Sequence, residues 1–300
     1  MGILFALLAA LFASTSNLFL RRSIDAGGSA KAYLVVQLSF SFFVMVLLNP
    51  VRTGDYGWSF PPFAWGLVGG VLFGLLMWGL GRTLEKGPPG LTFATLNSSS
   101  VMPGIMMALL FGATYGHPYS ITTALGSVLV VLGLFWAGWT SAENPHKAFW
   151  IFFVSFIFVI HTLFLVFLQW WAMVLKPPLP TFALLPFHLP SISNQWFMPS
   201  IFLAGALFQW GVYFTQRQRM PYGVEIAYGI IGGVANGGCV FFQILAPQVA
   251  APWENAMIFP VFSVTIIVLC NAWAQLLYKE QVNWLANGVC IAGLVIGTAL

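Results

Sequence analysis

The sequence predicts an all-α integral membrane protein with ten transmembrane helices, arranged as two inverted five-helix repeats. Three observations lead to this fold class. Of the 300 residues, 59% are hydrophobic and only 6% are charged, against about 25% charged in soluble domains. Apolar stretches of about 20 residues, the length that crosses a bilayer, recur along the whole chain, whose mean hydropathy is +0.89. A glycine-rich motif also occurs twice.

The apolar stretches are separated by Pro, Gly and charged residues, which mark helix ends. The expected spans are 2–20, 32–50, 61–83, 90–112, 120–140, 148–168, 196–216, 222–246, 254–278 and 283–300. The first is interpreted as a spanning helix rather than a signal peptide, because no basic residue precedes it. One long, proline-rich connection, 172–195, is expected either to lie along the membrane surface or over a cavity mouth, or to be a plain linker.

Lys and Arg are concentrated in every second connection between these spans. The odd connections carry Arg21, Arg22, Lys31, Arg82, Lys86, Lys147, Arg217, Arg219 and Lys279, whereas the even ones carry only Arg52 and Lys176. The positive-inside rule then puts the odd connections in the cytoplasm and both chain ends outside. The net charge of +4 is interpreted as this orientation signal and not as a nucleic-acid-binding surface.

The repeated motif divides the chain into halves of about 1–142 and 145–300. "AWGLVGGVLFG" (64–74) and "AYGIIGGVANG" (227–237) are identical at six of eleven positions, and "GSVLVVLGLF" (126–135) aligns with "ANGVCIAGLV" (286–295). The two glycine-rich spans are the third and the eighth, so they cross the bilayer in opposite directions. The repeat is therefore expected to be inverted, an architecture typical of alternating-access transporters.

Glycines four residues apart share one face of a helix, where a neighbouring backbone can approach closely. Each copy of the motif has such a row, which is interpreted either as a static packing face or as a gliding or hinge surface. The rows are Gly66, Gly70, Gly74 and Gly229, Gly233, Gly237.

Further stretches of both halves resemble the drug/metabolite transporter superfamily, in its ten-helix, EamA-type branch. They are "ATLNSSSVMPGIMMALLFG" (94–112), "GSVLVVLGLF" (126–135) and the segment 255–300. In that family, the last two helices of each half carry a mid-helix Pro, a Glu in the turn and a glycine-patterned final helix. Pro260, Glu280 and Gly293 match this pattern in the second half, and Pro103 and Gly133 in the first, where "GHPYS" replaces the turn Glu.

The resemblance implies a secondary transporter with a central cavity lined by the first, third, fourth, sixth, eighth and ninth helices. It also implies that both termini lie inside, in conflict with the charge count. Polar side chains in these helices are costly unless they face a partner or a water-filled cavity. The candidate substrate-binding residues are Trp78, Asn97, Ser98, Ser100, His161, Tyr228, Asn236 and Asn271. Helix-to-helix hydrogen bonding would use the same groups.

Two ionisable residues are candidates for proton coupling. His161 lies near the middle of the sixth span, and an imidazole suits either substrate binding or proton transfer. Its alternative role is a neutral contact to a neighbouring helix. Glu225 begins the eighth span, where a partly desolvated carboxylate could bind a proton or an amine, or pair with Arg217 or Arg219 as an interfacial anchor.

The function expected from the sequence is secondary transport of a small polar metabolite, such as a sugar or an amino acid. The chain contains no P-loop, no CxxC and no HExxH motif, and its three cysteines lie in apolar runs, so no cofactor or metal site is predicted. Partners are expected to be the substrate, protons as an open alternative, and the lipid bilayer of a bacterial inner membrane. The alternatives are a membrane-embedded enzyme acting on a lipid or isoprenoid, and a non-transporting scaffold; the sequence leaves monomer or homodimer open.

Overall fold

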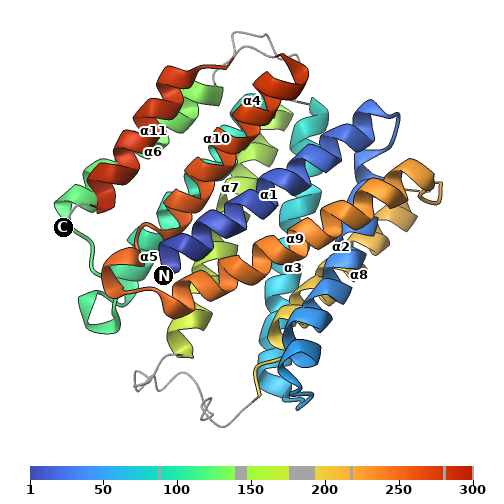
Figure 1. Cartoon of the computed structure of the whole chain (residues 1–300), viewed down its shortest axis with the longest axis horizontal. Helices are drawn as coiled ribbons and strands as arrows, with labels where there is room; N and C mark the ends of the chain where they lie inside the picture. The colour runs from blue at the N-terminus through green and yellow to red at the C-terminus, as the bar shows by residue number, and fades with distance from the viewer. Residues whose placement is uncertain (87–88, 139–146, 176–192, 217–218, 280–281, 299–300) are drawn as a thin grey trace.

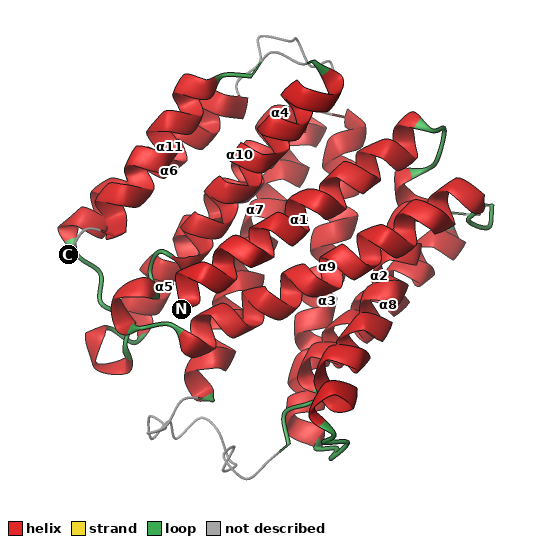
Figure 2. Cartoon of the chain, viewed as in Figure 1, coloured by secondary structure: helices red, strands yellow, loops and turns green. Residues whose placement is uncertain are grey.

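The computed structural model describes residues 1–86, 89–138, 147–175, 193–216, 219–279 and 282–298. Within these ranges all regular structure is helical and no strand occurs (Figure 2). Figure 1 shows the helices side by side in one bundle. They are α1 (Gly2–Asp25), α2 (Ala30–Val46), α3 (Phe60–Lys86), α4 (Pro89–Ser98), α5 (Met102–Leu110), α6 (Ile121–Gly138), α7 (Lys147–Val174), α8 (Phe197–Thr215), α9 (Gly223–Val249), α10 (Ile258–Tyr278) and α11 (Trp284–Thr298).

Eight helical segments of the described chain are long and apolar enough to cross a membrane: α1, α2 with its π-helical extension Leu47–Val51, α3, α4 with α5, α7, α8, α9 and α10. Helices α6 and α11 are apolar but shorter. The prediction of an all-helical, multi-pass membrane protein is therefore confirmed. The ends differ from those expected, because α1 runs to Asp25 and α7 to Val174, inside the expected connection 172–195, of which 176–192 lie outside the described residues.

The fourth expected span is not one continuous helix. Its middle, Ser99–Val101, is a single 3₁₀ turn that separates α4 from α5, and Pro103 follows in the first turn of α5. A proline in the first turn loses no helical hydrogen bond, since the N–H groups there have no acceptor within the helix. Pro260 was also expected in the middle of a helix. It instead lies in the first turn of α10, because this helix begins at Ile258, after a 3₁₀ turn at Pro252–Glu254.

Helices of the two halves interleave. Helix α1 packs on α9 and α10, α2 on α8 and α9, α3 on α7 and α8, and α6 on α11 at one edge of the bundle (Figure 1). The largest core cluster includes side chains of α1, α7, α8, α9 and α10, with Trp171 stacked on Phe197 at a ring-centroid distance of 4.4 Å. Because lipid tails are as apolar as these side chains, close packing and hydrogen bonds hold such helices together.

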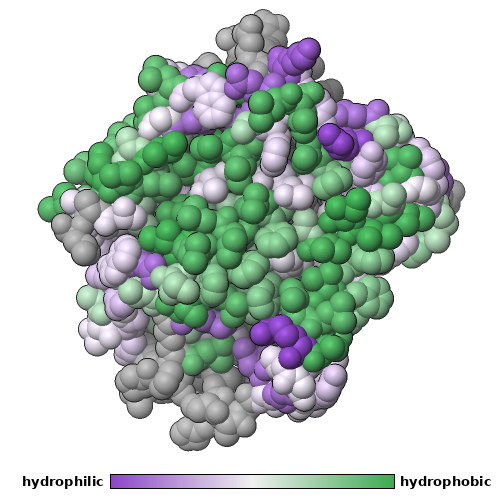
Figure 3. Space-filling model, viewed as in Figure 1, coloured by the Kyte–Doolittle hydropathy of each residue, from purple (hydrophilic) through white to green (hydrophobic). Residues whose placement is uncertain are grey.

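The start of α1 and the end of α11 lie toward the same side of the bundle (Figure 1). The face in Figure 3 is mainly hydrophobic across its middle, with hydrophilic residues toward the edges, as expected for a protein surrounded by lipid. Basic residues of the odd connections lie near the ends of helices that meet at one end of the bundle. The described ones are Arg21, Arg22, Lys31, Arg82, Arg219 and Lys279.

Both glycine rows face a helix of the other half. A Cβ on Gly70 would lie 2.3 Å from the Ile201 carbonyl oxygen of α8, and one on Gly233 would lie 2.5 Å from Phe40 Cβ of α2. Real Cβ atoms do not approach this closely, so glycine is what lets the backbones meet. The other members of the rows meet the same two helices: Gly66 and Gly74 contact α8, and Gly229 and Gly237 contact α2.

Candidate functional site

The 3₁₀ turn between α4 and α5 carries a run of buried serines. Ser98, Ser99 and Ser100 are all at most 2% exposed. A 3₁₀ turn in the middle of a helix often marks a hinge, because its hydrogen bonds are shifted from the α-helical pattern. We call the segment Ser98–Val101 the helix break. It brings backbone and hydroxyl groups together at the middle of a membrane-spanning segment.

His161 of α7 contacts the helix break directly. Its Nδ1 lies 2.6 Å from Ser99 Oγ and 3.0 Å from the Leu96 carbonyl oxygen, which belongs to the last turn of α4, where carbonyls lose their helical partners. With a proton on Nδ1 the imidazole donates to the Leu96 carbonyl; without one, it accepts from Ser99. Either tautomer ties α7 to the break, and the ring is only 8% exposed.

Three further hydroxyl groups near these helices have no hydrogen-bond partner within the described part of the chain. They are Ser100 Oγ in the break, Thr162 Oγ1 beside His161 and Ser263 Oγ of α10. Helix α10 packs against the break, and Val101 and Val264 share one core cluster. Because a buried hydroxyl without a partner costs about 1–3 kcal/mol, these groups are suited to bind a ligand's polar atoms.

The chemistry of this site is neutral. Its groups are hydroxyls, an imidazole and backbone carbonyls, and no set of three metal-ligating side chains (His, Cys, Asp or Glu) gathers among the residues that the structure describes. Such groups exchange hydrogen bonds with hydroxyl, amide or carbonyl groups of a ligand.

The other candidates in this span bond to their own helix. Asn97 donates to the Phe93 carbonyl at 2.8 Å and Ser98 to the Ala94 carbonyl at 2.7 Å. Ser99 was not among the candidate substrate-binding residues, yet it is the serine that meets His161. Sequence spacing alone does not distinguish these three neighbours, because the 3₁₀ turn changes which of them faces α7.

The asparagines and aromatic residues proposed for a shared binding site lie apart. Asn236 donates to Ser41 Oγ of α2 at 3.2 Å, whereas Asn271 donates to Asn287 Oδ1 of α11 at 3.0 Å. Tyr228 lies against Phe19 of α1, with ring centroids 5.9 Å apart. These contacts join neighbouring helices and do not converge on one centre.

A polar row on α2 was missed by the sequence reasoning. Tyr33 donates to the Ser16 carbonyl at 2.9 Å, Gln37 to Ser16 Oγ at 2.7 Å, and Ser41 to the Gly233 carbonyl at 3.0 Å. A Cβ on Gly232 would collide with the Tyr33 hydroxyl. The signal was present in the sequence, since Tyr33, Gln37 and Ser41 are four residues apart, like the glycines that they face.

Glu225 lies in the first turn of α9 and holds together the turn before α9 and the turn before α2. Both its oxygens accept from the Arg219 guanidinium, at 2.7 and 2.8 Å, and they also accept from the backbone N–H groups of Ser29 and Tyr222. The carboxylate is fully buried, whereas Arg219 is half-exposed, and these hydrogen bonds raise the pKa of Arg219 above its ordinary value. The interfacial pairing with Arg219 thus occurs; Arg217 lies outside the described residues, as does Glu280.

Glu254 makes a similar arrangement at the opposite end of α1. It is 3% exposed and accepts from the N–H groups of Ile3 at 3.1 Å and Ala251 at 2.8 Å, and from the terminal ammonium of Met1 at 3.2 Å. Burial alone would raise the pKa of this carboxyl. These donors outweigh burial and hold the pKa below its ordinary value.

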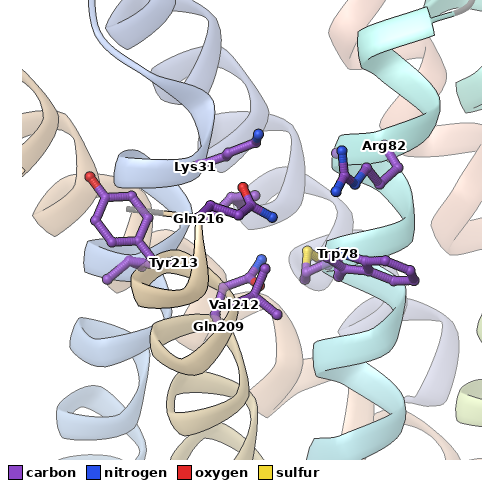
Figure 4. A pocket seen from close by; sticks show the side chains of 11 residues that line it. Lys31, Trp78, Arg82, Gln209, Val212, Tyr213 and Gln216 are labelled. Carbon is purple, nitrogen blue, oxygen red and sulfur yellow. The ribbon is translucent and has the colours of Figure 1, made fainter. Parts of the chain in front are cut away.

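Trp78 lines a recess at a different place, between α2, α3 and α8. The indole ring of Trp78 packs on Phe153 and Phe156 of α7, at centroid distances of 5.5 and 6.0 Å. Figure 4 shows Lys31 and Arg82 on opposite sides of this space, with Gln209 of α8 and Gln216, which directly follows α8, on the same side as Lys31. We call it the lateral recess. Helices α2 and α8 correspond to the second and seventh expected spans, which are not among those expected to line a central cavity.

Comparison with known proteins identifies the fold only. No protein-family model matches the chain, and no curated protein matches it. Among solved structures 27 chains are similar. One of them, described only as "Crystal structure of protein", superposes with a TM-score of 0.70, covering 99% of this chain and 95% of that chain at 16% sequence identity. The likeness shows that the helices are arranged as in a known fold.

Proposed function

We propose that the protein is a secondary transporter of a small, uncharged or zwitterionic polar metabolite, working by alternating access between two inverted five-helix repeats. The substrate would bind at the helix break, facing His161 of α7. The chain is then an EamA-type member of the drug/metabolite transporter superfamily, with halves at about 1–142 and 145–300. Ten membrane crossings result when α6 and α11 also span the bilayer.

The observation that carries this proposal is the symmetry of helix packing. Exchanging the halves replaces α1 with α7, α2 with α8, α3 with α9, α4 and α5 with α10, and α6 with α11. The pairing of α1 with α9 then becomes that of α7 with α3, and α2 with α9 becomes α8 with α3; all four pairings occur. The glycine rows follow the same exchange, which supports an inverted repeat.

The helix break supports transport in a second way. Substrate sites of secondary transporters are commonly built from discontinuous helices near the middle of the membrane, where freed backbone groups meet the ligand. Here the break combines that geometry with hydroxyls that have no partner in the described chain. A substrate with several hydroxyl or amide groups would provide those partners, which is why we propose sugars, amino acids or similar compounds.

Glu225 is assigned a different role. Its two oxygens already accept from Arg219 and from two backbone N–H groups, so we propose that it fixes the turns at one end of the bundle. If transport is coupled to protons, His161 is the side chain that we propose to carry the proton. It lies at the break, whereas Glu225 lies at a helix end.

The test is uptake into proteoliposomes. Purified protein in liposomes should take up a labelled sugar, amino acid or nucleoside in a saturable way. Ser99→Ala and His161→Ala each remove a buried hydrogen bond at the break, so each should lower uptake by about tenfold. Thr215→Ala removes an exposed hydroxyl at the end of α8 and should leave uptake unchanged.

Several results would contradict parts of the proposal. Absence of saturable uptake across a broad metabolite library would argue against transport, and turnover of a lipid by the same liposomes would favour the enzyme alternative. Unchanged uptake by Ser99→Ala and His161→Ala would move the substrate site away from the break. A pH profile of uptake that stays the same in His161→Ala would exclude this residue from proton coupling.

A further inference from the structure

The turn between α9 and α10 joins several other elements at one end of the bundle. Its residues 255–257 follow the 3₁₀ turn Pro252–Glu254 and precede α10, and each of them is at most 7% exposed. This is the end where α1 starts and α7 ends. The positive-inside rule makes it the outer end. We call residues 255–257 the closing turn.

Asn255 joins the closing turn to two neighbouring elements by hydrogen bonds. The side-chain Nε2 of Gln169, in α7, donates to the Asn255 carbonyl at 2.7 Å. The Asn255 side chain in turn donates to the Gly116 carbonyl, in the connection between α5 and α6. Both bonds join uncharged groups, and such bonds are about half as strong as bonds to an ionised group.

Ala256 and Met257 lie close against glycines of two further helices. A Cβ on Gly104 of α5 would lie 2.8 Å from the Ala256 carbonyl oxygen. A Cβ on Gly297, at the end of α11, would lie 2.6 Å from Met257 Cε. Glycine is what allows approaches this close. The closing turn therefore leaves no space beside α5 or α11.

The closing turn lies beyond the helix break in the direction of this end of the bundle. At a rise of 1.5 Å per residue, Gly104 lies about 6 Å beyond Ser100, and Gln169 lies about 12 Å beyond His161. On α10, Ser263 lies about 8 Å from the start of the helix by the same rise. The three segments that face the break are thus joined to one another a short distance beyond it.

We infer that the closing turn is the gate at this end of the proposed transport path and is closed in this structure. It opens by separating Asn255 from Gln169 and Gly116, and Ala256 from Gly104. A ligand at the helix break then has access to this end of the bundle. The inference rests on the proposed function, because only a transporter needs such a gate.

Two observations indicate how the gate opens. The Oε1 of Gln169 is buried, and no residue that the structure describes donates to it. Opening admits water to this oxygen, and the open form thereby gains a hydrogen bond that the closed form lacks. Glu254 stays in place, because its ionised carboxylate accepts from the Ile3 and Ala251 N–H groups and such bonds are the stronger ones.

The test measures how often the gate opens in the full chain in micelles. Ala256→Cys is introduced into a chain whose native cysteines are replaced, and a maleimide reaches its buried thiol only when the gate opens. Gln169→Met and Asn255→Ala each remove one hydrogen bond of the closing turn, so each should raise the labelling rate by about two- to tenfold. Thr265→Val removes a hydroxyl that is bonded within α10 itself, and should leave the rate unchanged.

Further thiols separate gating from a general loosening of the fold. Cys239 is buried in α9. Kept as the sole cysteine in parallel chains, it reports opening of the bundle as a whole, and its labelling should not change in Gln169→Met. Met257→Cys introduces a smaller side chain and serves as a second reporter where Ala256→Cys does not fold. In proteoliposomes, a maleimide attached at position 256 should abolish uptake, whereas one attached to the exposed Ser120→Cys should not.

The inference is overturned if Gln169→Met and Asn255→Ala leave the labelling of position 256 unchanged. It is also overturned if they accelerate the labelling of Cys239 equally, because the closing turn would then be a structural contact only. Labelling does not require uptake. Unchanged labelling in a chain that takes up substrate would therefore contradict the gate alone, whereas a wild-type chain without uptake would contradict the proposed function on which the gate rests.

Discussion

Glu225 and Glu254 illustrate what a buried carboxylate does in this protein. Each accepts two backbone N–H groups, from the start of one helix and from a turn next to α9. A carboxylate without such donors would not stay ionised in an apolar surrounding. Glu225 ties the turn after α1 to the start of α9, and Glu254 ties the start of α1 to the turn after α9. Helices α1 and α9 are thus joined at both ends.

Protonation of Glu254 should weaken the fold at low pH. Its pKa in the folded chain lies below the ordinary value of 4.5 for a glutamate, because the donors around the carboxylate outweigh burial. The stability that it contributes is therefore complete above that pH and is lost as the pH falls through the folded-state pKa. We expect the Tm of the wild-type protein to drop more steeply between about pH 5 and pH 3 than that of Glu254→Gln. Parallel curves in micelles would contradict this role.

Individual polar residues were the hardest part to predict. His161 could be selected from the sequence because an ionisable group in the middle of an apolar run is rare. Its partner could not be selected, since Asn97, Ser98, Ser99 and Ser100 are adjacent and differ only in the direction that the 3₁₀ turn gives them. Asn236, a candidate substrate-binding residue, stands where the first copy of the glycine-rich motif has Phe73, but it bonds to the neighbouring helix α2.

At the scale of helices, the glycine rows set how closely α3 approaches α8 and how closely α9 approaches α2. The two glycine rows have the same spacing and lie in different halves of the chain, and each packs on a helix of the other half. Between them, α2 and α8 also contact each other. These four helices therefore form a layer with close backbone contacts, in which an added side chain cannot be accommodated without separating two helices.

Adding one methyl group should have different effects at a glycine packed against another helix and at a glycine with open space beside it. In Gly70→Ala the new Cβ would meet the Ile201 carbonyl and Ala204 Cβ, at 2.3 and 2.6 Å, so we expect a loss of about 1–3 kcal/mol. Gly211→Ala in α8 meets nothing within 4 Å, and should be neutral or stabilise by up to about 1 kcal/mol. Unfolding in nanodiscs measures both. Equal effects would show that the glycine row does not control packing.

The positions of the helices were largely predictable, but their ends were not. Long apolar runs define a spanning segment by composition alone, whereas a helix end depends on contacts made by distant residues. Helix α10 starts at Ile258 and not at residue 254, because Pro252–Glu254 form a 3₁₀ turn. In this turn the Glu254 carboxylate accepts a hydrogen bond from the Ile3 N–H at the start of α1. The 3₁₀ turn at Ser99–Val101 was not predicted, since the fourth span was expected to be one helix over 90–112.

At the scale of the whole molecule, orientation in the membrane can be tested directly. Single cysteines replace Asp25 or Lys279 at one end of the bundle, and Asp55 or Tyr119 at the other, in a chain whose native cysteines are changed to serine or alanine. By the positive-inside rule, an impermeant maleimide added to intact cells should label positions 55 and 119 but not 25 and 279. Labelling of 25 and 279 instead would place both termini in the cytoplasm, as the family resemblance implies.

The all-helical, multi-pass membrane class followed from composition, whereas the division into halves at about 1–142 and 145–300 stays a prediction from the repeated motif. The pairing of helices between the halves could not be read from the sequence, because an apolar helix surface fits lipid and protein almost equally well. The lateral recess was also not predicted. Lys31 and Arg82 are 51 residues apart in sequence, and as loop charges they served only as an orientation signal.

The interleaving of the halves affects how the chain is made. The main neighbours of α1 are α9 and α10, and those of α2 are α8 and α9. When the ribosome has synthesised α1, α2 and α3, none of these neighbours has yet been made. The hydroxyl groups of Ser16 and Ser41 then still lack the α9 carbonyl groups to which they donate in the complete fold, so the packing of α1 and α2 is completed only near the end of synthesis.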